Sequence, residues 1–212
     1  MKKITSIRKL NPATDYEEFY LSLKEARGQH HYGLFVALEE KEVYQDMILF
    51  MIGDREAGVA VHNGNIVAVH KNPQRTQQKD LMKSLATTAI ENGGEKLDCY
   101  GEHLVKEYMK YGLLPVGRMK FDINVLDEEN RKEWLKRGLG EPDVVALLLP
   151  PQGKAKPIDL SYSDIKEFLP YFDDYDKMLE FRDALLADAK ANGKAYDEIL
   201  EYLQQINSNK RS

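Results

Sequence analysis

The chain of 212 residues carries a formal net charge of −5 at pH 7, and 42% of its residues are hydrophobic while 31% are charged. This composition is typical of a soluble globular protein, and the acidic balance disfavours general nucleic-acid binding. No stretch approaches the roughly 18 apolar residues that a membrane-spanning helix needs, and the single cysteine, Cys99, cannot form an intrachain disulfide. We therefore expect a cytoplasmic protein that does not enter a membrane.

The N-terminal region predicts a strand followed by a helix. Residues 4–10 form the first expected strand. Thr14 and Glu17 have the spacing of a capping box, in which each side chain bonds the backbone N–H of the other residue, so the helix is expected over residues 14–27. Residues 34–44 fit a strand or a helix equally well.

An antiparallel meander should follow. Its expected strands are short apolar runs rich in β-branched residues. The dipeptide Asn63-Gly64 between two of them is a strong hairpin signal. These strands span residues 47–52, 57–62 and 66–70.

The middle of the chain alternates helices and strands. Apolar residues at helical spacing predict a helix over 79–92, which Gly93-Gly94 ends, and a helix over 103–111, for which Gly112 is a C-cap candidate. This order predicts an α+β fold with a mixed sheet and helical crossovers. The remaining strands are expected over residues 96–100, 113–123 and 144–149.

The C-terminal region differs in its pattern, because only helices are expected after about residue 160. Pro150-Pro151-Gln152-Gly153 ends the strand-rich part, so we predict one domain over 1–150 and a helical hairpin extension over 151–212. The extension could pack on the first domain, form a homodimer or dock on a protein partner. Its helices are expected near residues 163–169, 175–191 and 195–206.

One segment carries a family resemblance. The sequence EYMKYGLLPV over residues 107–116 resembles the Y-x-x-x-G-[FL]-x-x-V segment of the GNAT (Gcn5-related N-acetyltransferase) superfamily. The preceding GGEKLDCYG, over residues 93–101, is similar to GNAT-like proteins of tailed phages and prophages. The resemblance covers roughly residues 1–150. It implies a GNAT-like acyl-CoA N-acyltransferase fold and the transfer of an acetyl group from acetyl-CoA to an amine of unknown substrate.

The resemblance also implies roles for particular residues. Tyr108 matches the tyrosine that protonates the leaving thiolate in the family, and strand backbone N–H groups polarise the thioester carbonyl. The general base stays open among His70, Asp98 and Glu56. The backbone from Val67 to His70, with Val69 between them, would line the gap that takes the pantetheine arm of acetyl-CoA. No metal is implied.

The loop that should bind the pyrophosphate of acetyl-CoA departs from the family pattern. GNAT proteins use [QR]-x-x-G-x-[GA] at a helix N-terminus, where bare N–H groups meet the phosphates. Here Gln78 and Asp80 stand at the glycine positions, while Arg75 and Lys79 could offset the negative charge of Asp80. The alternative function is therefore a degenerate GNAT-fold module, for binding or structure in a phage context, without acetyl-CoA activity.

Overall fold

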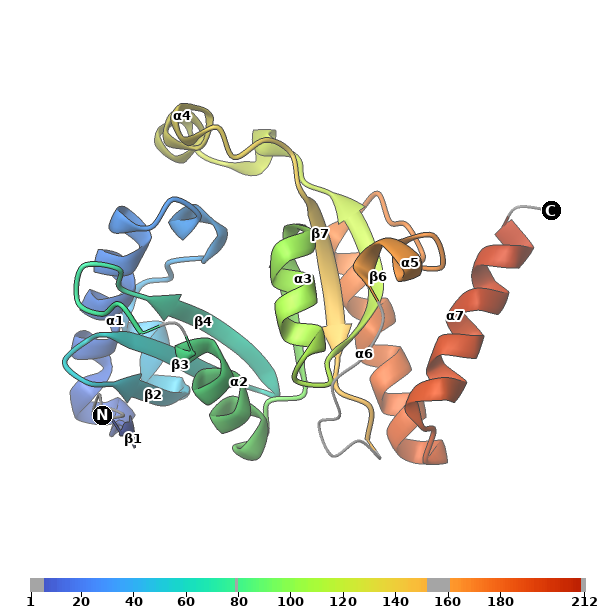
Figure 1. Ribbon diagram of the computed structural model, residues 1–212, viewed down its shortest axis with the longest axis horizontal. Coiled ribbons are helices and arrows are strands. Elements are labelled where there is room, and N and C mark those ends of the chain that lie inside the picture. Colours follow the sequence, from blue (N-terminus) through green and yellow to red (C-terminus); the bar gives the residue numbers. More distant parts are fainter. Residues whose placement is uncertain (1–5, 79, 152–160, 211–212) are drawn as a thin grey trace. The chain divides into compact units, whose positions relative to one another are not determined.

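The computed structural model describes residues 6–78, 80–151 and 161–210. The chain divides into two compact units between Gly94 and Glu95, and each unit combines a sheet with helices (Figure 1). The mixed α/β character expected from the sequence is confirmed. The division into compact units falls between Gly94 and Glu95. The domain boundary expected after residue 150 is not tested by this division and stays a prediction.

The first unit contains four strands that pair antiparallel in sequence order. The predicted meander is confirmed, and its turn at Asn63-Gly64 has positive φ at both residues, 48° and 77°, as a type I′ hairpin requires. The strands are β1 (Ile7–Lys9), β2 (Ile48–Ile52), β3 (Ala57–His62) and β4 (Asn65–Lys71).

Two helices pack on this sheet, α1 (Pro12–Gln29) and α2 (Leu81–Glu91). The first buries Phe19 and Leu23 against a core that includes Leu49 and Ala60, while α2 contacts β3 and β4. The ambiguous segment 34–44 is neither strand nor α-helix. It contains coil and two 3₁₀ turns, Gly33–Phe35 and Lys41–Asp46.

The start of α1 corrects the capping prediction. The N-cap is Asn11, whose side-chain Oδ1 accepts a hydrogen bond from the N–H of Ala13 at 3.1 Å. Asp15 Oδ2 accepts from the N–H of Asn11 at 3.0 Å. Thr14 lies inside the first turn, because Pro12 can occupy the first helical position without losing a hydrogen bond. The capping interaction therefore exists three residues earlier than Thr14 and Glu17 predicted.

The second unit contains three strands in the order β5-β7-β6, all antiparallel neighbours. Helix α3 contacts all three strands. Between β6 and β7 the chain leaves the sheet, forms α4 and returns, and Trp134 anchors this excursion by packing on Phe121 at 4.5 Å between ring centroids. The elements are β5 (Lys96–Tyr100), α3 (Gly101–Met109), β6 (Leu114–Lys120), α4 (Glu128–Arg137) and β7 (Asp143–Leu148).

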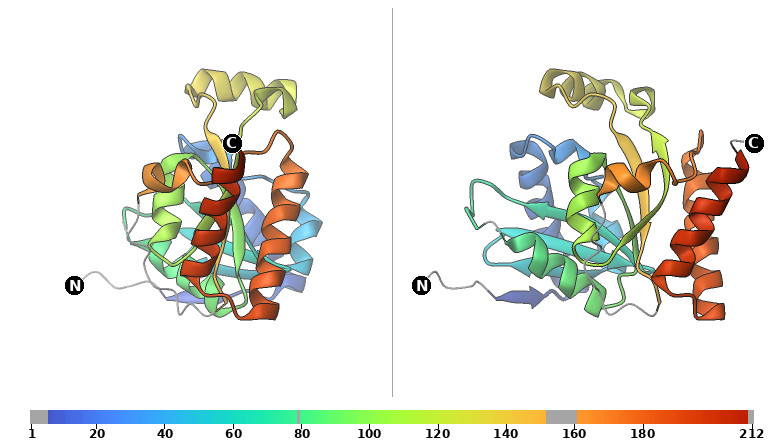
Figure 2. Two further views of the ribbon diagram at one scale, coloured as in Figure 1. Left: turned by 90° about the vertical axis from the view of Figure 1, so that its right-hand side faces the viewer. Right: turned by 45° about the vertical axis from the view of Figure 1, so that its right-hand side comes forward.

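The C-terminal region is helical as predicted, with α5 (Tyr162–Lys166), α6 (Tyr175–Asn192) and α7 (Tyr196–Lys210). Figure 2 shows α6 alongside the sheet of the second unit, where it contacts β6 and β7. Before α6, Tyr171 forms a parallel bridge with Arg118 at the free edge of β6. Among the described residues, no helix combines the length and hydropathy that crossing a bilayer requires.

The corrected cap gives a stability prediction. Asn11→Ala should lower the free energy of unfolding by about 1 kcal/mol, because the N–H of Ala13 loses its acceptor. Thr14→Ala is the matched control and should change stability by less than half of that amount, since within the described residues the Thr14 hydroxyl bonds only the neighbouring carboxylate of Asp15. Urea denaturation of both variants measures the difference. A larger loss in the Thr14 variant would contradict the assignment of Asn11 as the cap.

Candidate functional site

Strand β4 holds two of the predicted cofactor-binding residues, Val67 and Val69, on either side of an irregularity. Opposite Val59, the ladder between β3 and β4 shifts by one residue, so that two residues of β4 face one residue of β3. Ala68 has φ of +52°, a left-handed conformation that is uncommon for a residue with a side chain. This is a β-bulge, which locally interrupts the pairing of backbone groups. Val67, Ala68 and Val69 are all half-buried.

His70, a predicted base, is buried between β4 and α1. Its Nδ1 lies 2.8 Å from the carbonyl oxygen of Ala68, and its Nε2 lies 2.8 Å from the hydroxyl of Ser22. The ring also packs edge-on against Phe19, with centroids 5.3 Å apart. Burial lowers the pKa of His70 to about 4. A neutral ring whose two nitrogens both have protein partners has no lone pair left for an incoming amine, so this geometry gives no support to His70 as the base.

The loop after β4 places Arg75 in an ion-pair cluster. Arg75 Nε and Arg55 Nη1 each donate to the carboxylate of Glu25 at 2.8 Å, and Arg75 Nη1 reaches Asp54 at 3.3 Å. The side-chain amide of Asn72 donates to the same carboxylate at 3.1 Å. The hydrogen bond from Arg75 lowers the pKa of Glu25 most, and the charges of both arginines and the hydrogen bond from Asn72 lower it further, against some desolvation. The two arginines and the two carboxylates carry opposite charges that cancel.

Gln78 and Asp80, which the resemblance set at two glycine positions, lie just before α2. The N–H of Gln78 donates to the hydroxyl of Thr76 at 3.2 Å, and its carbonyl accepts from the ammonium of Lys71 at 2.6 Å. Asp80 is the exposed N-cap residue of α2, and its side chain makes no capping hydrogen bond. Lys79, the fourth residue predicted for this loop, lies outside the described residues. A pyrophosphate needs several free backbone N–H groups at a helix N-terminus. Here the N–H of Gln78 is bonded to Thr76, and Asp80 adds a negative charge.

In the second unit, Tyr108 lies on α3 with its side chain buried. Burial raises the pKa of the phenol, and the neighbouring Cys99 thiol adds to this effect. Cys99 is itself buried with a raised pKa, so its thiol stays protonated and unreactive. Gly112 follows α3 with φ of +89°, which matches its expected place at the end of this helix.

Asp98 lies on the opposite face of β5 from Cys99, because successive side chains of a strand alternate between faces. Its carboxylate lies near the hydroxyl of Tyr175 and the guanidinium of Arg182, both on α6. Burial nevertheless raises the pKa of Asp98. Within the second unit, the structure thus separates the predicted acid from this predicted base by the thickness of the sheet.

Sequence reasoning missed the residues that hold the predicted ones. Ser22 and Glu25 lie on α1, far from any motif, and no local pattern marks them as partners of His70 and Arg75. The only usable signal was Gly58, a glycine inside a strand, which often indicates close backbone approach or a bulge nearby.

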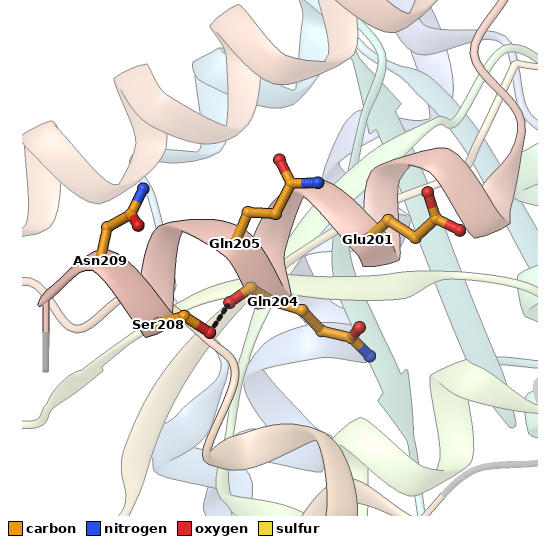
Figure 3. A pocket seen from close by; sticks show the side chains of 5 residues that line it. All are labelled: Glu201, Gln204, Gln205, Ser208 and Asn209. Carbon is orange, nitrogen blue, oxygen red and sulfur yellow. Dashed lines mark hydrogen bonds between the residues drawn. The ribbon is translucent and has the colours of Figure 1, made fainter. Parts of the chain in front are cut away.

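The helix α7 borders a shallow hollow that contains none of the predicted site residues. Figure 3 shows its lining, in which the hydroxyl of Ser208 donates to the carbonyl of Gln204 at 2.9 Å within the same helix. A hollow lined by one helix cannot enclose a ligand as a binding cleft does, so we assign it no function. The lining residues are Glu201, Gln204, Gln205, Ser208 and Asn209.

Comparison with known proteins adds no assignment. No protein-family model matches the sequence, and no curated protein matches it. Within residues 6–78, 80–151 and 161–210, no three His, Cys, Asp or Glu side chains gather as metal ligands would. The GNAT resemblance therefore stays a prediction.

The buried histidine predicts a specific acid sensitivity. Below pH 6.5 the unfolded chain gains a proton on His70, whereas the folded protein gains it only near pH 4. The unfolded state thus binds more protons in this window, and stability is lost as the pH falls. Between pH 7 and pH 5, native protein should lose about 2 kcal/mol more stability than a His70→Asn variant, which has no such group. Urea denaturation at both pH values measures this, and equal losses would show that His70 titrates normally in the folded protein.

Proposed function

We propose that the chain is a GNAT-like protein of the α+β class that transfers an acetyl group from acetyl-CoA to an amine. The observation that carries this proposal is the bulge at Ala68 on β4, because a bulge interrupts the ladder and re-aims backbone groups. The Ala68 carbonyl bonds His70, so the Val69 N–H is the group that we propose for the ligand. Such groups are what an amide-containing pantetheine arm and a thioester carbonyl require. The order of elements supports the same proposal, since a meander, a helix, a strand, the helix with Tyr108 and an antiparallel strand pair follow one another.

The proposed reaction uses the acyl half of acetyl-CoA. The cofactor would supply the acetyl group as a thioester, so that the amine nitrogen bonds to the carbonyl carbon while the carbon–sulfur bond breaks. The hydroxyl of Tyr108, which stays protonated because burial raises its pKa, would give its proton to the departing sulfur. The amine must also lose a proton. Both ring nitrogens of His70 have protein partners, and Asp98 faces away from Tyr108. We therefore propose that Glu56, whose carboxylate has a buried oxygen without a hydrogen-bond partner in the described part of the chain, or a chain of water molecules takes this proton.

Tyr108 gives the test of this chemistry. Tyr108→Phe should lower acetyl-CoA turnover by roughly 10²-fold, the range of a lost general acid, with little change in acetyl-CoA affinity. Tyr111→Phe is the matched control, because Tyr111 follows α3, donates its hydroxyl proton to Glu107 and has no proposed role. Acetylated products from a mixture of amines can be followed by mass spectrometry. Equal turnover in the native protein and the Tyr108 variant would remove Tyr108 from the mechanism.

A second candidate is the degenerate GNAT-fold module, and the pyrophosphate loop favours it. Arg75 is the loop residue best suited to bind a phosphate, but its guanidinium already donates hydrogen bonds to the carboxylate of Glu25. Asp54 bonds the same guanidinium. With Gln78 and Asp80 in place of glycines, the loop offers fewer free donors to an anion than the family pattern does. This candidate binds a partner, or stabilises an assembly, without acetyl-CoA turnover.

Titration calorimetry with acetyl-CoA separates the two candidates. Gln78→Gly combined with Asp80→Gly should strengthen binding by about 1–3 kcal/mol if the acyl half of the site is intact. Glu25→Gln should strengthen it by about fivefold, because a partly exposed ion pair that competes for Arg75 contributes roughly 1 kcal/mol. Glu18→Gln is the control, since Glu18 on the same helix pairs only with Arg8 among the ion pairs of the described chain. If neither the native protein nor any variant binds acetyl-CoA, the second candidate stands.

A further inference from the structure

The bulge on β4 determines on which face of the sheet His70 lies. Val67 pairs with Ala60, and His70 pairs with Gly58. Three positions separate Val67 from His70, so in a regular strand they would lie on opposite faces. The extra residue of the bulge restores the alternation, and both side chains lie on the face that α1 covers. His70 can therefore reach Ser22 only while the bulge persists.

His70 also bonds the backbone of the bulge. A carbonyl oxygen can only accept a hydrogen bond, so the 2.8 Å contact between Nδ1 and the Ala68 carbonyl places the ring proton on Nδ1. The other nitrogen then accepts, and the hydroxyl of Ser22, which is fully buried, donates to it at 2.8 Å. This pair of hydrogen bonds fixes the tautomer, the ring orientation and the direction of the Ala68 carbonyl.

The space for the ring is reserved by the opposite strand. A Cβ atom built on Gly58 would lie 2.6 Å from Cε1 of His70 and 3.0 Å from the ring of Phe19. No other amino acid at this position leaves room for the imidazole. Gly58, His70 and Ser22 thus form one unit across β3, β4 and α1, with Ala68 as the residue that it constrains.

We propose that His70 is a positioning residue, which with Ser22 holds Ala68 of the β4 bulge in its left-handed conformation and so fixes the Ala68–Val69 peptide. The peptide is planar, so fixing the Ala68 carbonyl also fixes the direction of the Val69 N–H. The role of this peptide in aligning a thioester rests on the proposed acetyl transfer. The clamp itself does not, since it is a property of the free protein.

Two measurements test the clamp without acetyl-CoA. Nitrogen NMR of the native protein should show the proton of the His70 ring on Nδ1 and none on Nε2 at pH 7. Replacement of Ala68 by glycine should offset the loss of stability that follows when the hydrogen bonds of His70 are removed, because glycine adopts positive φ without steric cost. The unfolding midpoint should therefore fall clearly in His70→Phe and recover in His70→Phe combined with Ala68→Gly. A proton on Nε2, or a double variant no more stable than His70→Phe alone, would overturn the proposal.

A third measurement separates positioning from packing. His70→Asn keeps an N–H donor near the place of Nδ1, whereas His70→Phe keeps the ring volume without a donor. Turnover with acetyl-CoA should fall by about 10²-fold in His70→Phe, as expected for a misplaced reacting group, and by less than about tenfold in His70→Asn. A greater loss in His70→Asn would overturn the positioning role. If the native protein transfers no acetyl group, the proposed function fails, and the tautomer and the glycine suppressor still decide the clamp.

Discussion

The one-residue shift between β3 and β4 is the constraint on which the first unit depends. Without it, His70 would leave the face of α1, its two hydrogen bonds would break and the empty space beside Gly58 would have no occupant. With it, a buried polar ring is fully satisfied, as buried polar groups need to be. The same shift places a backbone irregularity in a strand that is otherwise regular, and this irregularity is the main structural reason to propose chemistry there.

The ion cluster after β4 works against that chemistry. A carboxylate of α1 supplies the anion that Arg75 and Arg55 would otherwise seek in a ligand. Asn72, which is fully buried, ties the loop to the same carboxylate and to the backbone of Glu56. The loop is therefore held in shape by internal contacts. An anionic ligand that binds here has to replace the bonds to Glu25, and its affinity is reduced by what those bonds contribute.

Much of the fold follows from local patterns. The strands β2 and β3, the Asn63-Gly64 turn and the helices α2, α3 and α6 are where hydrophobic spacing and breaker residues indicate, because each signal lies within a few residues of its effect. The prediction of the α1 cap at Thr14 was wrong, because two overlapping sets of polar residues can cap the same helix end. Pro12, which suits the first helical position, favours Asn11 as the cap. The bulge at Ala68 was not foreseen, since alternation assumes a constant period of two. The partners of His70 and Arg75 on α1, Ser22 and Glu25, lie 48 and 50 positions away in the chain, beyond any local pattern.

The short bridge between Tyr171 and Arg118 limits the pairing of another chain with the edge of β6. At the outer edge of β6, the N–H of Arg118 donates to the carbonyl of Pro170 and its carbonyl accepts from the N–H of Phe172, at 3.0 and 2.9 Å. An open strand edge is a template on which another chain can add, and it is a common origin of aggregation. Here the polypeptide occupies that template with its own later residues. At Arg118, residues 170–172 thus fill backbone hydrogen-bonding positions of the β6 edge, so that the folded chain offers fewer such positions to another copy.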